Sequence, residues 1–225
     1  MTAPDEDGAQ AKTQPALLES RRRYWNERGT SFTDPKAAVG YCVDGVPVGD
    51  DFIEAIVAEV RSKLDLNSTV RLLDVGGGAG LIRQRVEPEV AVYYLTDFSW
   101  SMLQRAGGAR RAFVSEAGRL PLAGGVVDRV LCYSVFLEFP DLEYARMAIV
   151  ELLRVTRAGG VILIGDLPFP PDRPRPAGAH RLHFDPGFFQ SLALPDATVD
   201  LLEQVMPAKR RVNQRFDVRL RKLTG

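Results

Sequence analysis

Short apolar segments alternate with segments of helical periodicity through the middle of this chain, and no other feature restricts the fold as much. Five segments are rich in β-branched and apolar residues, as strands covered on both faces are: "VRLLDV", "VAVYYLTD", "RAFVSE", "VVDRVLCYSV" and "VILIGD". Helical spacing of apolar residues is clearest in "DDFIEAIVAEVRSKL" and "LEYARMAIVELLRVTR". This alternation predicts an α/β fold, a doubly wound and mostly parallel sheet with helices on both faces.

The last part of the chain predicts two further strands, "ATVDLLEQV" and "VNQRFDVRLRKL". We expect them to pair antiparallel and to complete a seven-stranded sheet. In the second strand apolar and polar residues alternate: Val212, Phe216, Val218 and Leu220 against Asn213, Arg215, Asp217, Arg219 and Arg221. The alternation predicts one buried and one solvent-exposed face, so the arginines are expected to face solvent rather than RNA.

Polar residues and glycines at the segment ends predict where helices begin and end. Helix starts are expected at Asp50 or Asp51, at Ser99 or Ser101, and after Asp185. Gly29 is expected to end a helix in "LLESRRRYWNERG", and Gly159-Gly160 to end the long helix before "VILIGD".

The 225 residues suit one domain of ordinary size. Residues 1–15 are acidic and polar and are expected to form a disordered tail, leaving 16–225 as the single domain. Residues 167–186 hold six prolines and interrupt the alternation, which predicts a long loop that acts as a lid.

Charge and cysteine usage argue against several classes of protein. The 29 basic and 29 acidic residues cancel, so no overall field attracts nucleic acid. No apolar run is long enough to span a bilayer, and the polar N-terminus lacks the apolar core of a secretory signal, so we expect a cytoplasmic protein without a membrane partner. Cys42 and Cys132 lack metal-ligand spacing, so no metal site is expected. The oligomeric state stays open.

The stretch "LLDVGGGAG", residues 72–80, places a carboxylate and four glycines where the first strand of the alternation ends. Ligands of open α/β sheets bind beyond the carboxyl ends of the strands, and glycines let a ligand approach the backbone there. The spacing is D-x-G-x-G-x-G, through Asp74, Gly76, Gly78 and Gly80. A dinucleotide-binding turn would instead need a glycine at position 81, which is leucine.

This spacing resembles the first motif of class I S-adenosylmethionine-dependent methyltransferases. Three later segments resemble further motifs of that family in the same order: "YYLTDFSWSML", "FVSEAGRLPLAGGVVDRVLCYSVFLEF" and "LLRVTRAGGVILIGD". The resemblance implies S-adenosylmethionine as cofactor and S-adenosylhomocysteine as product. It departs from the family pattern at Ser115, where glycine is usual, at Glu116, where aspartate is usual, and at Ala158, where proline is usual.

The resemblance also implies a set of cofactor-binding residues: Tyr24, Asp74, Gly76, Gly78, Asp97, Phe98, Glu116, Ala117 and Ser134. Asp97 would hold the two ribose hydroxyls, since a carboxylate accepts two hydrogen bonds at once. Glu116 would accept from the adenine amino group, and Asp74 would receive the cofactor's ammonium. Residues 16–49 would form a cover over the cofactor and substrate, with Tyr24 and Trp25 as aromatic contacts.

Four residues are candidate bases on the acceptor side: His180, His183, Glu138 and Asp166. The two histidines are the only ones in the chain and lie in the proline-rich segment; their alternative is a solvent-facing position. Glu138 and Asp166 follow or end strands, where each could equally cap a helix or be structural. Tyr41, Phe169 and Phe184 are further pocket candidates.

These features predict an enzyme that transfers a methyl group to an oxygen, nitrogen or carbon atom of a small molecule, in natural-product biosynthesis. RNA and protein methyltransferases remain alternatives, as does a protein that binds the cofactor without catalysis. A nicotinamide dehydrogenase is disfavoured by the glycine spacing.

Overall fold

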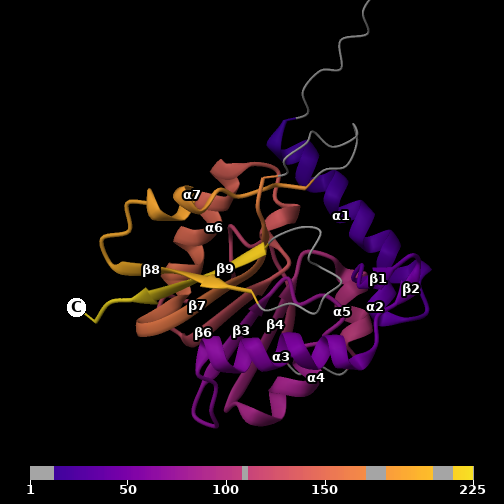
Figure 1. The fold of residues 1–225 in the computed structure, drawn as a ribbon, viewed down its shortest axis with the longest axis horizontal. Coiled ribbons are helices and arrows are strands. Elements are labelled where there is room, and N and C mark those ends of the chain that lie inside the picture. Colours follow the sequence, from indigo (N-terminus) through magenta and orange to yellow (C-terminus); the bar gives the residue numbers. More distant parts are fainter. Residues whose placement is uncertain (1–12, 108–110, 171–180, 205–214, 225) are drawn as a thin grey trace, which may run out of the picture.

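The computed structural model describes residues 13–107, 111–170, 181–204 and 215–224. Its centre is a seven-stranded sheet of order β5-β4-β3-β6-β7-β9-β8 (Figure 1). Five strands run parallel: β3 (Arg71–Val75), β4 (Val92–Asp97), β5 (Ala112–Val114), β6 (Val127–Tyr133) and β7 (Thr156–Pro168). β9 (Arg215–Lys222) runs antiparallel between β7 and β8 (Ala197–Glu203). The predicted fold class is confirmed, including the antiparallel closing strand.

Helices cover both faces of the sheet, with α3 and α4 on one side and α6 and α7 on the other (Figure 1). Successive strand residues point to opposite faces, and both faces are buried: Leu72 packs with the first group of helices and Leu73 with the second. The helices are α3 (Asp50–Leu64), α4 (Arg83–Val86), α5 (Trp100–Ala106), α6 (Leu142–Val155) and α7 (Pro186–Gln190), with short 3-10 turns η1 (Glu87–Glu89) and η2 (Phe136–Glu138). Two-sided burial explains the continuous apolar runs of the strands.

An N-terminal layer packs against α5 and consists of α1 (Gln14–Ser31), α2 (Pro35–Ala38) and the hairpin of β1 (Cys42–Val43) and β2 (Val46–Pro47). The Ser101 hydroxyl donates to the Asn26 carbonyl at 2.8 Å. A Cβ on Gly29 would lie 2.3 Å from Ser101 Oγ, so glycine serves close helix packing there. Gly29 therefore does not end the helix, which continues to Ser31. The helix begins at Gln14, inside the predicted tail of residues 1–15. Residues 1–12 of that tail lie outside the described residues.

Besides the helix end at Gly29, two predicted helix boundaries are wrong. The helix before β7 ends at Val155, because Thr156 already pairs with Val127 in the sheet, and Gly159-Gly160 lies within the strand. The N-cap of α3 is Gly49, and neither acid that follows it caps the helix. Ser99 and Asp185 cap α5 and α7 as predicted, each accepting a backbone N–H.

The described ends of residues 167–186 pack against the domain, while residues 181–185 form no helix or strand, and the lid stays a prediction. Leu167 and Pro168 pair with β9, and Pro186 begins α7. Phe184 is fully buried, with its ring 5.5–6.0 Å from those of Phe136, Phe188 and Phe189. Residues 171–180 lie outside the described residues.

The predicted solvent face of β9 is also wrong at Asp217, which is fully buried. Lys63 of α3 pairs with it at 2.6 Å, and the Asp166 amide donates to it at 2.8 Å. Both faces of β9 are covered in this part of the sheet. The apolar residues Phe216 and Val218 pack in the hydrophobic core, whereas Asp217 is buried in a polar contact with Lys63. Val212 and Asn213 lie outside the described residues.

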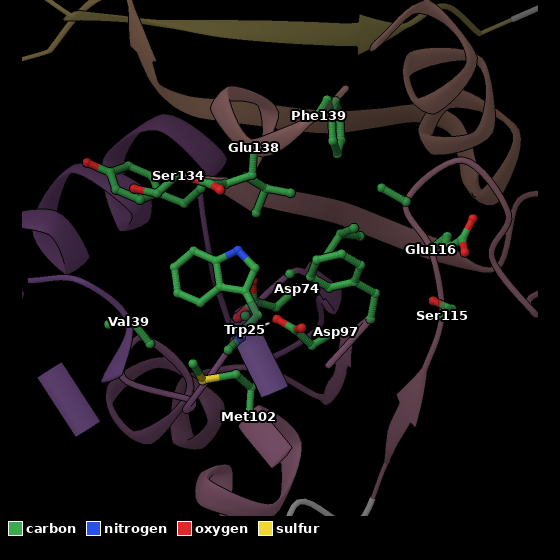
Figure 2. Close-up of a pocket in the computed structure, with 18 of the residues that line it drawn as sticks. Trp25, Val39, Asp74, Asp97, Met102, Ser115, Glu116, Ser134, Glu138 and Phe139 are labelled. Carbon is green, nitrogen blue, oxygen red and sulfur yellow. Dashed lines mark hydrogen bonds between the residues drawn. The ribbon is translucent and has the colours of Figure 1, made fainter. Parts of the chain in front are cut away.

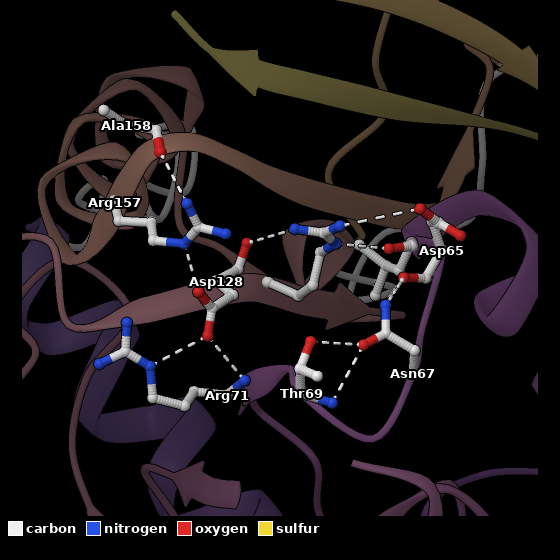
Figure 3. A network of polar contacts seen from close by, with 9 residues as sticks. Asp65, Asn67, Thr69, Arg71, Asp128, Arg157 and Ala158 are labelled. Carbon is white, nitrogen blue, oxygen red and sulfur yellow. Dashed lines mark hydrogen bonds and ion pairs between the residues drawn. The ribbon is translucent and has the colours of Figure 1, made fainter. Parts of the chain in front are cut away.

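The amino ends of three central strands are joined through Asp128 (Figure 3). Its carboxylate accepts from the Arg71 amide at 2.8 Å and from Arg71 Nε at 3.0 Å, and it also pairs with Arg157. Burial raises the pKa of Asp128, but the hydrogen bonds from the two arginines outweigh burial and hold the pKa near 2. This network fixes the sheet edge opposite the cavity. Within the described residues no helix combines the length and apolarity needed to cross a membrane.

Candidate functional site

A cavity of about 1010 Å³, part of it open to solvent, lies at the carboxyl ends of β3, β4 and β6 and is flanked by α1. Figure 2 shows the Trp25 indole between Ser134 and Glu138 on one side and Asp97 and Met102 on the other. Nine of the predicted cofactor-binding residues and bases line this cavity: Asp74, Gly76, Gly78, Asp97, Phe98, Glu116, Ala117, Ser134 and Glu138. The fold brings them together from four segments, which end or follow β3, β4, β5 and β6.

The glycine turn folds back onto the end of the neighbouring strand. The Gly76 and Gly77 amides both donate to the Thr96 carbonyl, at 2.7 and 3.1 Å. Gly76 and Gly78 have φ of +72° and +55°, which favours glycine. A Cβ on Gly77 would lie 2.4 Å from both Asp74 Oδ2 and Leu95 Cδ1. Gly77 is not one of the motif glycines, but the fold leaves no room there for a side chain.

Asp97 joins two loops at the end of β4. Its Oδ2 accepts from the Gly78 amide at 3.0 Å and its Oδ1 from the Ser99 amide at 2.8 Å. Burial raises the pKa of Asp97 to about 6, although these backbone donors stabilise the charged form. The carboxylate is therefore held in one orientation and is mostly ionised at neutral pH.

Asp74 lies on β3 beneath the glycine turn and is almost completely buried. The Tyr93 hydroxyl donates to its Oδ2 at 2.7 Å. Burial raises the pKa of Asp74 to about 7; the Tyr93 hydrogen bond opposes this rise and the charge of Asp97 adds to it. A cationic ligand group beside Asp74 would relieve this unfavourable burial.

Two acids at the cavity are paired with consecutive arginines of α1. Glu116 lies 2.5 Å from Arg22, and Glu138 pairs with Arg21. Desolvation lowers the pKa of Arg21. These ion pairs attach α1 to the cavity, and a role of Glu138 as a base stays a prediction.

Ser134 and Asp166 meet where β6 and β7 reach the cavity. Both have left-handed backbones, with φ of +60° and +66°. The Ser134 hydroxyl donates to Asp166 Oδ2, and Asp166 Oδ1 lies 3.4 Å from Arg215 Nε. Asp166 is buried and is not among the cavity-lining residues.

Comparison with known proteins finds a family that is similar to the segment around this site. Residues 73–164, which run from β3 into β7, match the sequence model of a family described as "Methyltransferase domain". The match covers less than half of the chain, so it shows that this central segment is similar to a methyltransferase domain. S-adenosylmethionine is the cofactor of this family.

Two relatives are each similar to less than half of this chain. Chondramide synthase cmdD of Chondromyces crocatus is 30% identical over 106 residues, which is 43% of this chain and 3% of that protein. Demethylmenaquinone methyltransferase of Beutenbergia cavernae is 33% identical over 109 residues, 46% of this chain and 43% of that protein. The matches thus cover less than half of either relative's length.

A solved structure extends the fold likeness to nearly the whole chain. Phosphoethanolamine N-methyltransferase 1 of Haemonchus contortus, in complex with phosphoethanolamine and S-adenosylhomocysteine, superposes with a TM-score of 0.73. The match covers 95% of this chain and 50% of that one at 14% identity. At this identity the likeness establishes the fold.

Three predicted site residues that the structure describes do not line the cavity: Tyr24, His183 and Asp166. Tyr24 is 41% exposed and does not line it; Trp25 does, with its ring 5.3 Å from that of Tyr24. Adjacent residues of a helix point in different directions, so only one of these two aromatics can point inward. His183 is not a lining residue, and His180 lies outside the described residues. A catalytic role for either histidine stays a prediction.

Of the three further aromatic candidates, only Tyr41 lines the cavity, while Phe169 and Phe184 pack in the core. Most of the walls were not predicted. They are apolar or aromatic side chains from separate elements: Leu18, Val39, Leu81, Ile82, Met102, Tyr133, Val135, Phe139 and Tyr144. Such residues have the same sequence signature as core residues, so only their placement identifies them.

The residues present fit the family's cofactor. A cation would fit beside Asp74, hydroxyl donors beside Asp97, and a flat heterocycle among the apolar walls. Side chains on Gly76 and Gly77 would clash with Val135 and with Asp74, so the turn has room for backbone only. Among the described residues no group of histidines, cysteines and acids could hold a metal ion.

Proposed function

We propose that the chain transfers the methyl group of S-adenosylmethionine to a small molecule and releases S-adenosylhomocysteine. The observation that supports this most is the buried Asp97 carboxylate, hydrogen-bonded to Gly78 of the glycine turn at the carboxyl edge of β4. An ionised acid held there suits ribose hydroxyls, and glycine backbone beside it leaves room for the amino-acid half. The cofactor, when bound, supplies an electrophilic methyl group.

The other cavity residues divide between the two halves of the cofactor. On the nucleoside side, Phe98 and Ala117 would pack against adenine, and Glu116 would accept from its amino group. On the amino-acid side the proposed contacts are Asp74, Gly76, Gly78 and Ser134. Asp74 would receive the ammonium, whose charge offsets the cost of burying the carboxylate.

A small acceptor fits a cavity that α1 partly covers. α1 is held there by the Arg21–Glu138 and Arg22–Glu116 ion pairs, which would obstruct the entry of a peptide or an RNA strand. A role in natural-product biosynthesis is supported only by the name of one relative, a chondramide synthase. The name of the other, a demethylmenaquinone methyltransferase, denotes another small acceptor. The cytoplasmic location stays a prediction.

Calorimetry with S-adenosylmethionine, S-adenosylhomocysteine and NAD⁺ tests the cofactor assignment. We expect saturable binding of the first two and none of NAD⁺, because the glycine spacing and Asp97 suit the methyl donor. Release of S-adenosylhomocysteine in the presence of a panel of small hydroxyl, amine and carbon acceptors then tests catalysis. Binding of NAD⁺ alone would contradict the assignment, and binding without turnover of any acceptor would favour a non-catalytic role.

The affinity for S-adenosylhomocysteine is expected to rise about tenfold between pH 6 and pH 8. The pKa of Asp74 is about 7 in the free protein, and a bound ammonium lowers it. Below pH 7 a proton must therefore leave Asp74 on binding, which weakens binding. Isothermal titration in buffers of different ionisation enthalpy measures both the affinity and the released proton.

The Asp74→Asn variant is the matched control for this pH dependence. It keeps an acceptor for the Tyr93 hydroxyl but cannot ionise, so its affinity should be low and should change less between pH 6 and pH 8. An affinity of the parent chain that does not vary with pH would exclude Asp74 as the ammonium partner.

A further inference from the structure

A chain of hydrogen bonds leads from the cavity into the protein through Tyr41, Ser134 and Asp166. Tyr41 and Ser134 line the cavity, with their hydroxyl oxygens 3.3 Å apart. The Ser134 hydroxyl donates to Asp166 Oδ2, and Asp166 is only 3% exposed. The proposed cofactor contacts use Ser134 alone, so they leave the rest of this chain unexplained.

The backbone is shaped to hold this pair together. Ser134 and Asp166 both adopt the left-handed conformation, which is costly for residues other than glycine and is concentrated at functional sites. The Ser134 amide donates to the Gly165 carbonyl at 3.0 Å, and the Asp166 amide donates to Asp217 at 2.8 Å. Neighbouring strands thus fix both strained residues with their side chains in contact.

Charged groups flank Asp166. Arg215 donates to the Asp166 carbonyl at 2.8 Å, and its Nε lies 3.4 Å from Asp166 Oδ1. A further charged group beside Asp166 is Asp217, which is paired with Lys63. Because the Ser134 hydroxyl donates to Asp166, the Tyr41 hydroxyl donates to Ser134 Oγ, and the second lone pair of Ser134 Oγ is available to a donor in the cavity.

The surroundings of Ser134 limit what that donor can be. Among the described residues no lysine or arginine lines the cavity, so nothing on these walls would offset an anionic acceptor. Aromatic rings do line it, from Trp25, Tyr41 and Phe139. An uncharged aromatic molecule with a hydroxyl group matches both conditions.

We propose that the methyl acceptor is an aromatic hydroxyl group that donates to Ser134, and that its proton passes through Ser134 to Asp166. This inference rests on the proposed methyl transfer. The acceptor oxygen bonds the methyl carbon with a lone pair, while the electron pair of the broken carbon–sulfur bond stays on sulfur. The acceptor proton moves to Ser134 Oγ as the serine proton moves to Asp166. When the product has left, Asp166 returns its proton to Ser134, and Ser134 releases one proton to water. Ser134 touches the acceptor, and Asp166 is a positioning residue that acts through it.

Two probes that differ by one proton donor test this inference: p-nitrophenol and p-nitroanisole, each titrated into the complex with S-adenosylhomocysteine. At a pH where p-nitrophenol is neutral, the parent chain should bind it at least about tenfold more tightly than p-nitroanisole, the size of one hydrogen bond to a charged network. In Asp166→Asn this preference should fall several-fold, while affinity for S-adenosylhomocysteine should fall by a smaller factor, because Asp166 does not line the cavity. Asparagine is nearly isosteric and tolerates the left-handed backbone.

Ser134→Gly provides a second variant, since glycine suits the same backbone and removes the hydroxyl; the preference should be lost. Asp200→Asn is the matched control. Asp200 of β8 is paired with Arg219 of β9 and does not line the cavity, so this variant should keep the preference. Equal binding of the two probes by the parent chain, binding of neither, or a preference that survives in both variants would overturn the inference. Failure of the proposed function is distinguishable, because the parent chain would then not bind S-adenosylhomocysteine.

Discussion

The Asp97→Asn variant is expected to bind S-adenosylhomocysteine about 10²- to 10³-fold more weakly than the parent chain, the loss of two hydrogen bonds to a charged group. The two carboxylate oxygens already accept from the Gly78 and Ser99 amides, at 3.0 and 2.8 Å. Asparagine keeps one oxygen and turns an amide donor toward the other amide. Both the ribose contacts and the position of the glycine turn should therefore suffer. Isothermal titration calorimetry measures the loss.

Glu116→Gln is the control for Asp97→Asn. The Glu116 side chain is 38% exposed, so water can replace the hydrogen bond that the variant loses. We expect its affinity to fall by less than about tenfold, one neutral hydrogen bond. Thermal unfolding should show that both variants are folded, since burial already raises the pKa of Asp97 and an uncharged side chain costs nothing in desolvation there. Undiminished affinity in folded Asp97→Asn would exclude Asp97 as the ribose ligand.

The Lys63→Met variant is expected to lower the free energy of unfolding by about 3–5 kcal/mol, the usual cost of leaving a buried charge without its partner. Lys63 Nζ lies 2.6 Å from Asp217 Oδ2 and 2.5 Å from Glu59 Oε2, and Asp217 is fully buried. Burial raises the pKa of Asp217 to about 6 even with Lys63 present. Urea denaturation monitored by circular dichroism measures the change.

The loss in Lys63→Met should be larger at pH 8 than at pH 5. Without Lys63 the pKa of Asp217 rises further, so folded Asp217 binds a proton that the unfolded chain releases above about pH 4. Stability then falls as pH rises through that interval. Adding Asp217→Asn should restore most of the loss. Lys36→Met removes the partner of the 74% exposed Asp50 and should cost under about 1 kcal/mol. Equal losses in the two lysine variants would contradict a buried pair.

Periodicity predicted the sheet and most of its strands, because short apolar runs between helical segments are typical of parallel strands buried on both faces. The sequence-based predictions were wrong where a glycine or an acid makes a contact with a residue distant in the sequence. Gly29 packs against Ser101 instead of ending a helix, and Gly159-Gly160 lies in β7 because Thr156 already pairs with Val127. Asp217 looked solvent-exposed, because its partner Lys63 lies more than 150 positions away in the chain.

By itself the sequence determined the α/β fold and which residues meet at one edge of the sheet. Asp74, Gly76, Gly78 and Asp97 lie next to strand ends, and parallel strands bring their carboxyl ends to one edge whatever else the chain does. Only the tertiary structure decided the other contacts around the cavity. Trp25 rather than Tyr24 lines the cavity, Arg21 pairs with Glu138, and Ser134 meets Asp166 from another strand. The residues in these contacts are far apart in the sequence and follow no motif. The packing of α1, β6 and β7 brings them together.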